Sequence, residues 1–225
     1  MNVAILVMNV AILVMNVENP VFDRILKIIF FKLPTTNTIQ YICFSQKRTM
    51  KYQNIREEEI KNKVGQDFFS NFDTTKIVGN IDFCVSHKTK NITHGSLTFG
   101  EGWGEVSLLW AEAKRGTFDV LTMITQLVLT IGKARTFDKF LPPAFLGAFD
   151  SQKIGFVPYN AIMDVFSMND FNWNVTPSNH ETREFKIIKE KIENELFQNH
   201  YVYNFLKDEA ELHFFIKHNI AKATE

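Results

Sequence analysis

The sequence predicts an α/β domain with a mixed central sheet flanked by helices, followed by a C-terminal helical extension. Apolar residues at mostly four-residue steps in residues 52–72 indicate a helix, and a second such pattern covers residues 118–136. Between them, residues 75–86 and 105–114 are apolar and rich in strand-forming residues. Helical patterns that alternate with strand patterns are typical of a sheet covered by helices.

The composition is that of an ordinary folded domain. The chain has 225 residues, of which 45% are hydrophobic and 22% charged, enough for one core with some appendages. Formal net charge is zero, so any affinity for DNA must come from a local basic patch. The two cysteines, Cys43 and Cys84, are too few for a disulfide framework, and we expect a reducing, cytoplasmic compartment.

Residues 1–49 are expected to lie outside the core. The first seven residues recur unchanged in the next seven, and a third copy begins at Met15. The repeat has no polar face for a coiled coil, and its asparagines, followed by Glu18, interrupt any membrane span. We interpret it as an N-terminal extension, with Met50 as an alternative start. A membrane tether through residues 1–33 remains open.

The first helix of the core is expected over residues 52–72. Ile60, Val64 and Phe68 belong to its apolar stripe, and an acidic run lies near its start. Two interpretations of this run stay open. It is either a solvated first turn favoured by the helix dipole, or it supplies Glu58 or Glu59 to a metal site.

The central hairpin is predicted from residues 75–86 and 105–114, joined by a long loop. The first strand carries Asp82, and the second carries Glu112 and Lys114. Because side chains alternate along a strand, Glu112 and Lys114 share a face with Trp110. The alternative to a functional site is an Asp82–Lys114 ion pair at the edge of the sheet.

The rest of the chain continues the alternation. A helix is expected over residues 118–136, and residues 144–149 and 153–157 form a hairpin signal. A capping-box pattern at residues 178–181 predicts the start of a long helix, and a last helix covers residues 208–221. We therefore predict a core domain over residues 50–177 and a helical extension over residues 178–225.

Asp82, Glu112 and Lys114 have the chemistry of a phosphodiester-cleaving site. Two carboxylates on neighbouring strands form a hard oxygen site suited to Mg²⁺, for which Mn²⁺ can substitute. A lysine beside them can orient a metal-activated water or offset charge on the phosphate. The Glu-x-Lys pattern also occurs at residues 59–61 and 184–186, but only the copy at 112–114 ends an apolar strand, where charges are costly.

The order helix, Asp82, hairpin, Glu112-Ala113-Lys114, helix resembles the PD-(D/E)XK nuclease superfamily. The resemblance implies a restriction-endonuclease-like core, with Asp82 and Glu112 as metal ligands and Lys114 as the catalytic cation. Glu58 or Glu59 would match the additional acidic ligand of many members. Gln126 resembles the glutamine that often follows the Glu-x-Lys strand in restriction nucleases.

Longer stretches are similar to the N-terminal cleavage module of type IIG-like restriction–modification enzymes, which fuse a nuclease and an adenine methyltransferase. These stretches are residues 110–115, 126–127, 132–135 and 172–180. The similarity covers about residues 52–220 and implies double-stranded DNA as substrate. It also implies a transient homodimer on DNA, because cutting both strands normally needs a second copy.

No methyltransferase part is recognisable in the sequence. It contains neither the Asn/Asp-Pro-Pro-Tyr motif nor a Gly-rich cofactor loop, so S-adenosylmethionine would bind only to a missing part. We therefore expect a truncated module whose methyltransferase or specificity module is encoded separately or downstream. Gly132-Lys133 lacks the flanking residues of a P-loop, and no role for ATP is expected.

Arg115, Gln126, Lys133 and Arg135 are the candidate DNA contacts, positioned before and along the second helix. The alternative for the last two is a solvated helix end favoured by the dipole. Two functions follow from the sequence. The first is a Mg²⁺-dependent DNA endonuclease module, and the second is a catalytically silent remnant that binds DNA or docks a partner.

Overall fold

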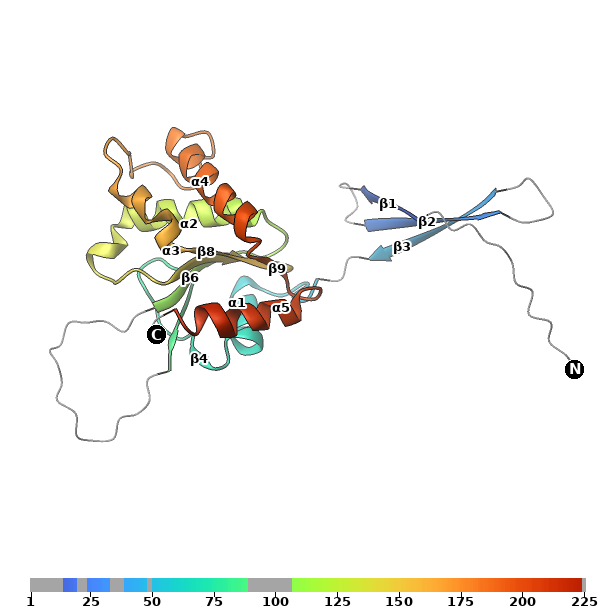
Figure 1. Cartoon of the computed structure of the whole chain (residues 1–225), viewed down its shortest axis with the longest axis horizontal. Coiled ribbons are helices and arrows are strands. Elements are labelled where there is room, and N and C mark those ends of the chain that lie inside the picture. Colours follow the sequence, from blue (N-terminus) through green and yellow to red (C-terminus); the bar gives the residue numbers. More distant parts are fainter. Residues whose placement is uncertain (1–13, 20–23, 33–38, 48–49, 89–106, 224–225) are drawn as a thin grey trace, which may run out of the picture. The chain divides into compact units, whose positions relative to one another are not determined.

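The computed structural model describes residues 14–19, 24–32, 39–47, 50–88 and 107–223 (Figure 1). Contacts within the chain divide it into two compact units, residues 1–49 and residues 50–225. The loop expected between the two central strands lies almost entirely outside the described residues.

The first unit contains a three-stranded antiparallel sheet. Its strands are β1 (Val14–Asn19), β2 (Arg24–Lys32) and β3 (Ile39–Lys47), in the order β1-β2-β3. The sequence patterns predicted no strand in this segment, so the three strands differ from the expectation. The β-branched and aromatic residues of β2 and β3 favour the extended backbone that the structure adopts.

The second unit is built on a six-stranded sheet with the order β4-β5-β6-β7-β8-β9. Only β6 and β7 run parallel, and all other neighbours are antiparallel, so the predicted mixed sheet is confirmed. The elements in chain order are α1 (Glu57–Phe68), β4 (Phe72–Asp73), β5 (Phe83–His87), β6 (Ser107–Ala113), α2 (Val120–Ala134), η1 (Thr136–Asp138), β7 (Phe145–Phe149), β8 (Lys153–Pro158), α3 (Tyr159–Ile162), η2 (Met163–Ser167), α4 (Arg183–Asn199), β9 (Val202–Asn204), α5 (Glu209–Phe215) and η3 (Ile216–Ile220).

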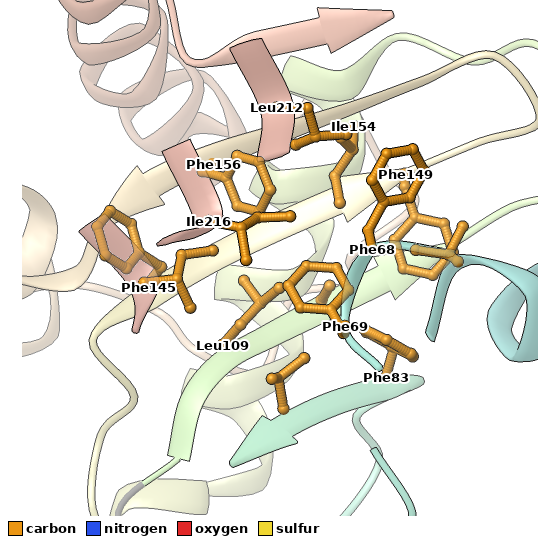
Figure 2. Close-up of a cluster of buried hydrophobic side chains, with 14 of the residues drawn as sticks. Phe68, Phe69, Phe83, Leu109, Phe145, Phe149, Ile154, Phe156, Leu212 and Ile216 are labelled. Carbon is orange, nitrogen blue, oxygen red and sulfur yellow. The ribbon is translucent and has the colours of Figure 1, made fainter. Parts of the chain in front are cut away.

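Helices cover both faces of this sheet, as predicted. In Figure 1, α1 and α5 lie on one side of it, and α2 and α4 lie on the other. The α1 and α5 side is filled by aromatic and aliphatic side chains, among them Phe68, Leu109, Phe149, Phe156 and Leu212, which Figure 2 shows converging from both helices and three strands. These side chains are at least 95% buried, and this burial stabilises the unit.

The crossover helix α2 connects the parallel strands β6 and β7. Its N-cap is Asp119, whose carboxylate accepts a hydrogen bond from the amide of Thr122 at 3.1 Å. The helix ends where Arg135 adopts a left-handed conformation with φ of 50°. The predicted helix and the β7–β8 hairpin are therefore both confirmed, within two residues at each helix end.

The C-terminal residues are part of the same compact unit. The helix α4 begins after Thr182, which caps the amide of Phe185 at 3.3 Å, so the capping box predicted at residues 178–181 is wrong by four residues. Its buried stripe, including Ile188, packs against α2. The short strand β9 pairs with β8 at the sheet edge. No helix in the described part of the chain is long and apolar enough to cross a membrane.

Candidate active site

The strand β6 carries Glu112 to the end of an otherwise buried segment. Leu109, Ala111 and Ala113 pack on the α1 side of the sheet, whereas Trp110 packs on the α2 side, so the predicted alternation is correct. Glu112 is the most exposed residue of β6, with 14% of its side chain exposed. An acidic group in this position is costly unless it has partners.

Asp82 comes from a turn that precedes β5. The prediction of a strand over residues 75–86 is wrong for its first part, because the strand begins only after Asp82. The amide of Ile81 donates to the carbonyl oxygen of Val78 at 3.0 Å, and Gly79 has φ of 53°, which breaks the extended backbone. Val78 and Ile81 reach the core from this turn instead of from a strand, whereas Ile77 is exposed.

Pairing of β5 with β6 brings the two carboxylates together. Phe83 lies opposite Ala111, and continuing this antiparallel register by one residue places Asp82 opposite Glu112. A carboxylate oxygen of Asp82 also accepts a hydrogen bond from the amide of Ala113 at 3.2 Å. Asp82 is therefore attached to the backbone of the residue between Glu112 and Lys114.

Lys114 pairs with Glu112. Its ammonium lies 2.6 Å from a carboxylate oxygen of Glu112, and a third of the Lys114 side chain remains exposed. The alternative derived from the sequence, an ion pair between Asp82 and Lys114, differs from the observed pairing. Lys114 follows the last residue of β6 and its amide donates to the carbonyl oxygen of Phe149 on β7 at 3.0 Å.

The surroundings of Glu112 and Lys114 raise the pKa values of both side chains. Burial raises the pKa of Glu112, and the hydrogen bond from Lys114 does not fully offset burial and the nearby charges of Asp82 and Glu57. Burial also opposes the charge of Lys114, but the hydrogen bond and the acidic charges around it raise its pKa overall. Lys114 is thus a stable cation, while negative charge on Glu112 is disfavoured.

Glu57 is the acidic residue of α1 whose charge affects the pKa values of Glu112 and Lys114. Its charge acts on both Glu112 and Lys114, and its side chain is partly buried. The two residues suggested by the sequence lie elsewhere on the helix surface. Glu58 pairs with Lys61 and is 80% exposed, and Glu59 pairs with a lysine one turn later.

A sequence signal for Glu57 existed. Glu57, Ile60, Val64 and Phe68 are spaced by three and four residues, and the last three are buried. Residues at this spacing share one face of a helix, so Glu57 extends the buried stripe of α1 towards the sheet. The position of a residue relative to the buried stripe therefore predicts which glutamate of α1 lies near the sheet better than its position within the acidic run does.

The donor set fits a small hard cation. Mg²⁺ is commonly held by one or two carboxylates, with waters and substrate phosphates completing its shell, and Asp82 and Glu112 supply two. Burial raises the pKa of Glu112 and the charge of Asp82 raises it further, so a cation held between the two carboxylates would relieve their repulsion. Within residues 50–88 and 107–223, however, no three His, Cys, Asp or Glu side chains come together as a self-sufficient metal site.

The candidate DNA contacts are divided between the two ends of α2. Arg115 is exposed directly after Lys114, whereas Lys133 lies in the last turn of α2, about 20 Å along the helix axis from its first residue. Lys133 approaches two backbone carbonyl oxygens at 3.3 and 3.4 Å, and Arg135 pairs with Asp138 at 2.8 Å. Gln126 contacts a ring nitrogen of His180 at 3.1 Å.

This separation of the candidate contacts changes the stretch of DNA that they would cover. Of these four residues, only Arg115 directly follows Lys114 in the chain. Lys133 and Arg135 instead line a pocket of about 460 Å³ together with Trp173 and Phe166.

Comparison of the chain with protein-family models, with curated proteins and with solved structures gives no match.

Proposed function

We propose that this protein is a Mg²⁺-dependent DNA endonuclease module with a PD-(D/E)XK type of site. The observation that carries the proposal is the convergence of Asp82, directly before β5, and Glu112 on β6, with the ammonium of Lys114 2.6 Å from Glu112. Two carboxylates and one cation at the open end of a buried strand pair are the groups that hydrolysis of a phosphodiester requires.

The residues of the chain have separable roles in this proposal. A bound Mg²⁺, or Mn²⁺ in its place, would polarise the phosphate and lower the pKa of a water molecule. Asp82 and Glu112 would hold the cation through their carboxylate oxygens. Glu57 would add negative charge nearby. Lys114 remains protonated and partly exposed, so it can offset negative charge that develops on the phosphate oxygens.

Binding of double-stranded DNA is proposed to begin at Arg115. Its exposed guanidinium follows Lys114 in the chain and is free to contact a backbone phosphate without reading sequence. Lys133 and Arg135 would contact the same duplex only if it extends along α2. A second copy of the chain on DNA and a separate methyltransferase or specificity module would complete a restriction–modification system.

Nicking of supercoiled plasmid tests the proposed activity. Wild-type protein should nick with Mg²⁺ or Mn²⁺ and not with EDTA. Asp82→Ala and Lys114→Ala should each lower the rate by about 100-fold or more. Lys186→Ala is the matched control, because this exposed lysine belongs to another Glu-x-Lys copy and pairs with Glu181 at 3.0 Å. Unchanged nicking by either site variant would overturn the proposal.

A catalytically silent remnant that binds DNA or docks a partner is the second candidate. It is favoured by the lack, within the described residues, of three His, Cys, Asp or Glu side chains that could hold a metal ion together. Calorimetric titration separates the two functions. Affinity for duplex DNA without affinity for Mg²⁺ or Mn²⁺ would support the remnant, and metal affinity that Asp82→Ala abolishes would support the nuclease.

A further inference from the structure

A buried carboxylate lies in the turn that follows β7, the strand next to β6 in the sheet. Asp150, in the turn between β7 and β8, is fully buried. One of its oxygens accepts hydrogen bonds from the amides of Gln152 and Lys153 at 2.6 and 2.8 Å, and the other accepts from the amide of Phe118 at 2.8 Å. Burial of a carboxylate is costly without such donors. The bond to Phe118 spans 32 residues of sequence, so Asp150 does more than shape its own turn.

The segment that follows β6 is attached to this turn at every second residue. The amide of Lys114 donates to the carbonyl oxygen of Phe149, and the amide of Gly116 donates to the hydroxyl of Ser151, both at 3.0 Å. The amide of Ser151 donates back to the carbonyl oxygen of Gly116 at 3.0 Å. With the bond from Phe118, four hydrogen bonds hold the backbone that leaves the Glu-x-Lys strand.

Apart from a contact of the Thr117 hydroxyl with the sulfur of Met50 at 3.5 Å, this segment has few other restraints among the described residues. Arg115, Thr117 and Phe118 are exposed, so apolar burial contributes little to its conformation. Gly116 has φ of 101°, a conformation that side-chain-bearing residues rarely adopt, which marks a sharp change of direction there. The hydrogen bonds from the β7–β8 turn therefore determine where the chain runs directly after Lys114.

We propose that Asp150 is a positioning residue that, with Ser151, holds the backbone of residues 114–118 and thereby keeps the ammonium of Lys114 beside Glu112. The contribution of this positioning to phosphodiester cleavage rests on the proposed nuclease function. The structural part does not, because it concerns only the place of Lys114. Asp150 itself acts through the backbone and contacts no substrate.

Asp150→Asn tests the inference with minimal change of shape. An asparagine has one acceptor oxygen and one donor nitrogen, so it cannot serve both the amide of Phe118 and the amides of its own turn. We expect a nicking rate lower by about 10- to 100-fold, with calorimetric affinity for Mg²⁺ within about twofold of wild type. Acetylation of Lys114 by acetic anhydride, followed by peptide mass spectrometry, should rise by about fivefold as its contact with Glu112 loosens.

Asp119→Asn is the matched control. Asp119 lies in the next turn of the same segment and caps α2, a role that asparagine fills equally well. Its nicking rate and the acetylation of Lys114 should match wild type. Ser151→Ala removes only the acceptor of the Gly116 amide, and we expect a smaller loss of about 3- to 10-fold. This variant also serves if Asp150→Asn does not fold.

A double variant shows whether the effect passes through Lys114. Adding Asp150→Asn to Lys114→Ala should lower the residual rate no further, because both changes remove the same group. Unchanged acetylation of Lys114 in folded Asp150→Asn and Ser151→Ala would overturn the inference, and so would a lower rate with a parallel loss of Mg²⁺ affinity. If wild-type protein does not nick DNA, the proposed function fails, while the acetylation result still decides whether Asp150 positions Lys114.

Discussion

The ammonium of Lys114 lies 2.6 Å from a carboxylate oxygen of Glu112, yet Glu112 is harder to ionise than a free glutamate. Burial and the charges of Asp82 and Glu57 outweigh the ion pair. Folding therefore places negative charge where the folded state disfavours it. An arrangement that lowers stability in this way is more typical of a functional site than of a structural ion pair.

Replacing Glu112 by glutamine should raise stability. A carboxyl group with a raised pKa binds protons more tightly in the folded state, so stability falls as pH rises from the ordinary pKa of glutamate through the raised value. This cost therefore grows as the pH rises from 4 towards 7, and Glu112→Gln removes it. We expect the melting temperature to increase by about 2 °C at pH 7 and by less at pH 4, measured by calorimetry.

Glu58→Gln is the control for this experiment, because Glu58 is 80% exposed and should leave the melting temperature within about 1 °C of wild type. A clear loss of stability in Glu112→Gln would show instead that the pair with Lys114 is structural. Glu112→Gln should also lose measurable affinity for Mg²⁺, since it removes one of the two proposed carboxylate ligands.

Replacing Glu57 by glutamine should weaken Mg²⁺ binding. Glu57 acts electrostatically on Glu112 and Lys114, so its removal lowers the negative charge available to a cation. We expect a loss of affinity of about tenfold by calorimetric titration, the scale of groups that surround metal ligands. Glu59→Gln, on another face of the helix, should have no effect. Equal effects of the two substitutions would contradict the assignment of Glu57.

Gly132→Ala should destabilise the protein, although alanine favours helices. A Cβ at Gly132 would lie 1.9 Å from a ring carbon of Trp173, far inside van der Waals contact. Overpacking of this kind costs about 1–3 kcal/mol, more than the gain of up to about 1 kcal/mol in helix propensity. Thermal unfolding should show a lower melting temperature, by a few degrees. In a Trp173→Ala background the same substitution should cost less, and equal costs in both backgrounds would exclude the clash as the cause.

Cys84 should resist thiol reagents in the folded protein. Burial raises the pKa of its thiol to about 12, so almost no thiolate is present at pH 8. In a Cys43→Ser background, reaction of the single remaining thiol with a disulfide reagent should be about 100-fold slower than in guanidinium. Fast reaction without denaturant would show that the β5 edge opens, because Cys84 is only 2% exposed.

Local patterns predicted the elements that depend on neighbouring residues. The apolar stripe of α2 is contained within the helix itself, and the β7–β8 hairpin needs only one short turn. The alternation along β6 likewise follows from the geometry of any strand, which is why Trp110 and Leu109 face opposite sides as expected. These features involve interactions over only a few residues of sequence.

Other features depend on contacts that a single segment does not contain. The turn before Asp82 has the apolar composition of a strand, but Val78 and Ile81 join the buried cluster of α2 from a turn. The capping pattern at residues 178–181 is locally as good as the cap actually used at Thr182. The strand β9 has only three residues and forms because β8 offers an unpaired edge.

The sequence by itself determined the class of the fold and singled out Asp82, Glu112 and Lys114, because strand alternation and the cost of charge beside apolar residues are local rules. Only the tertiary structure decided that Lys114 pairs with Glu112, that Glu57 is the acidic group of α1 that acts on them, and that Asp150 holds the chain beyond Lys114. These relationships join residues far apart in sequence, and they exist only once the strands are in register and the helices are packed on the sheet.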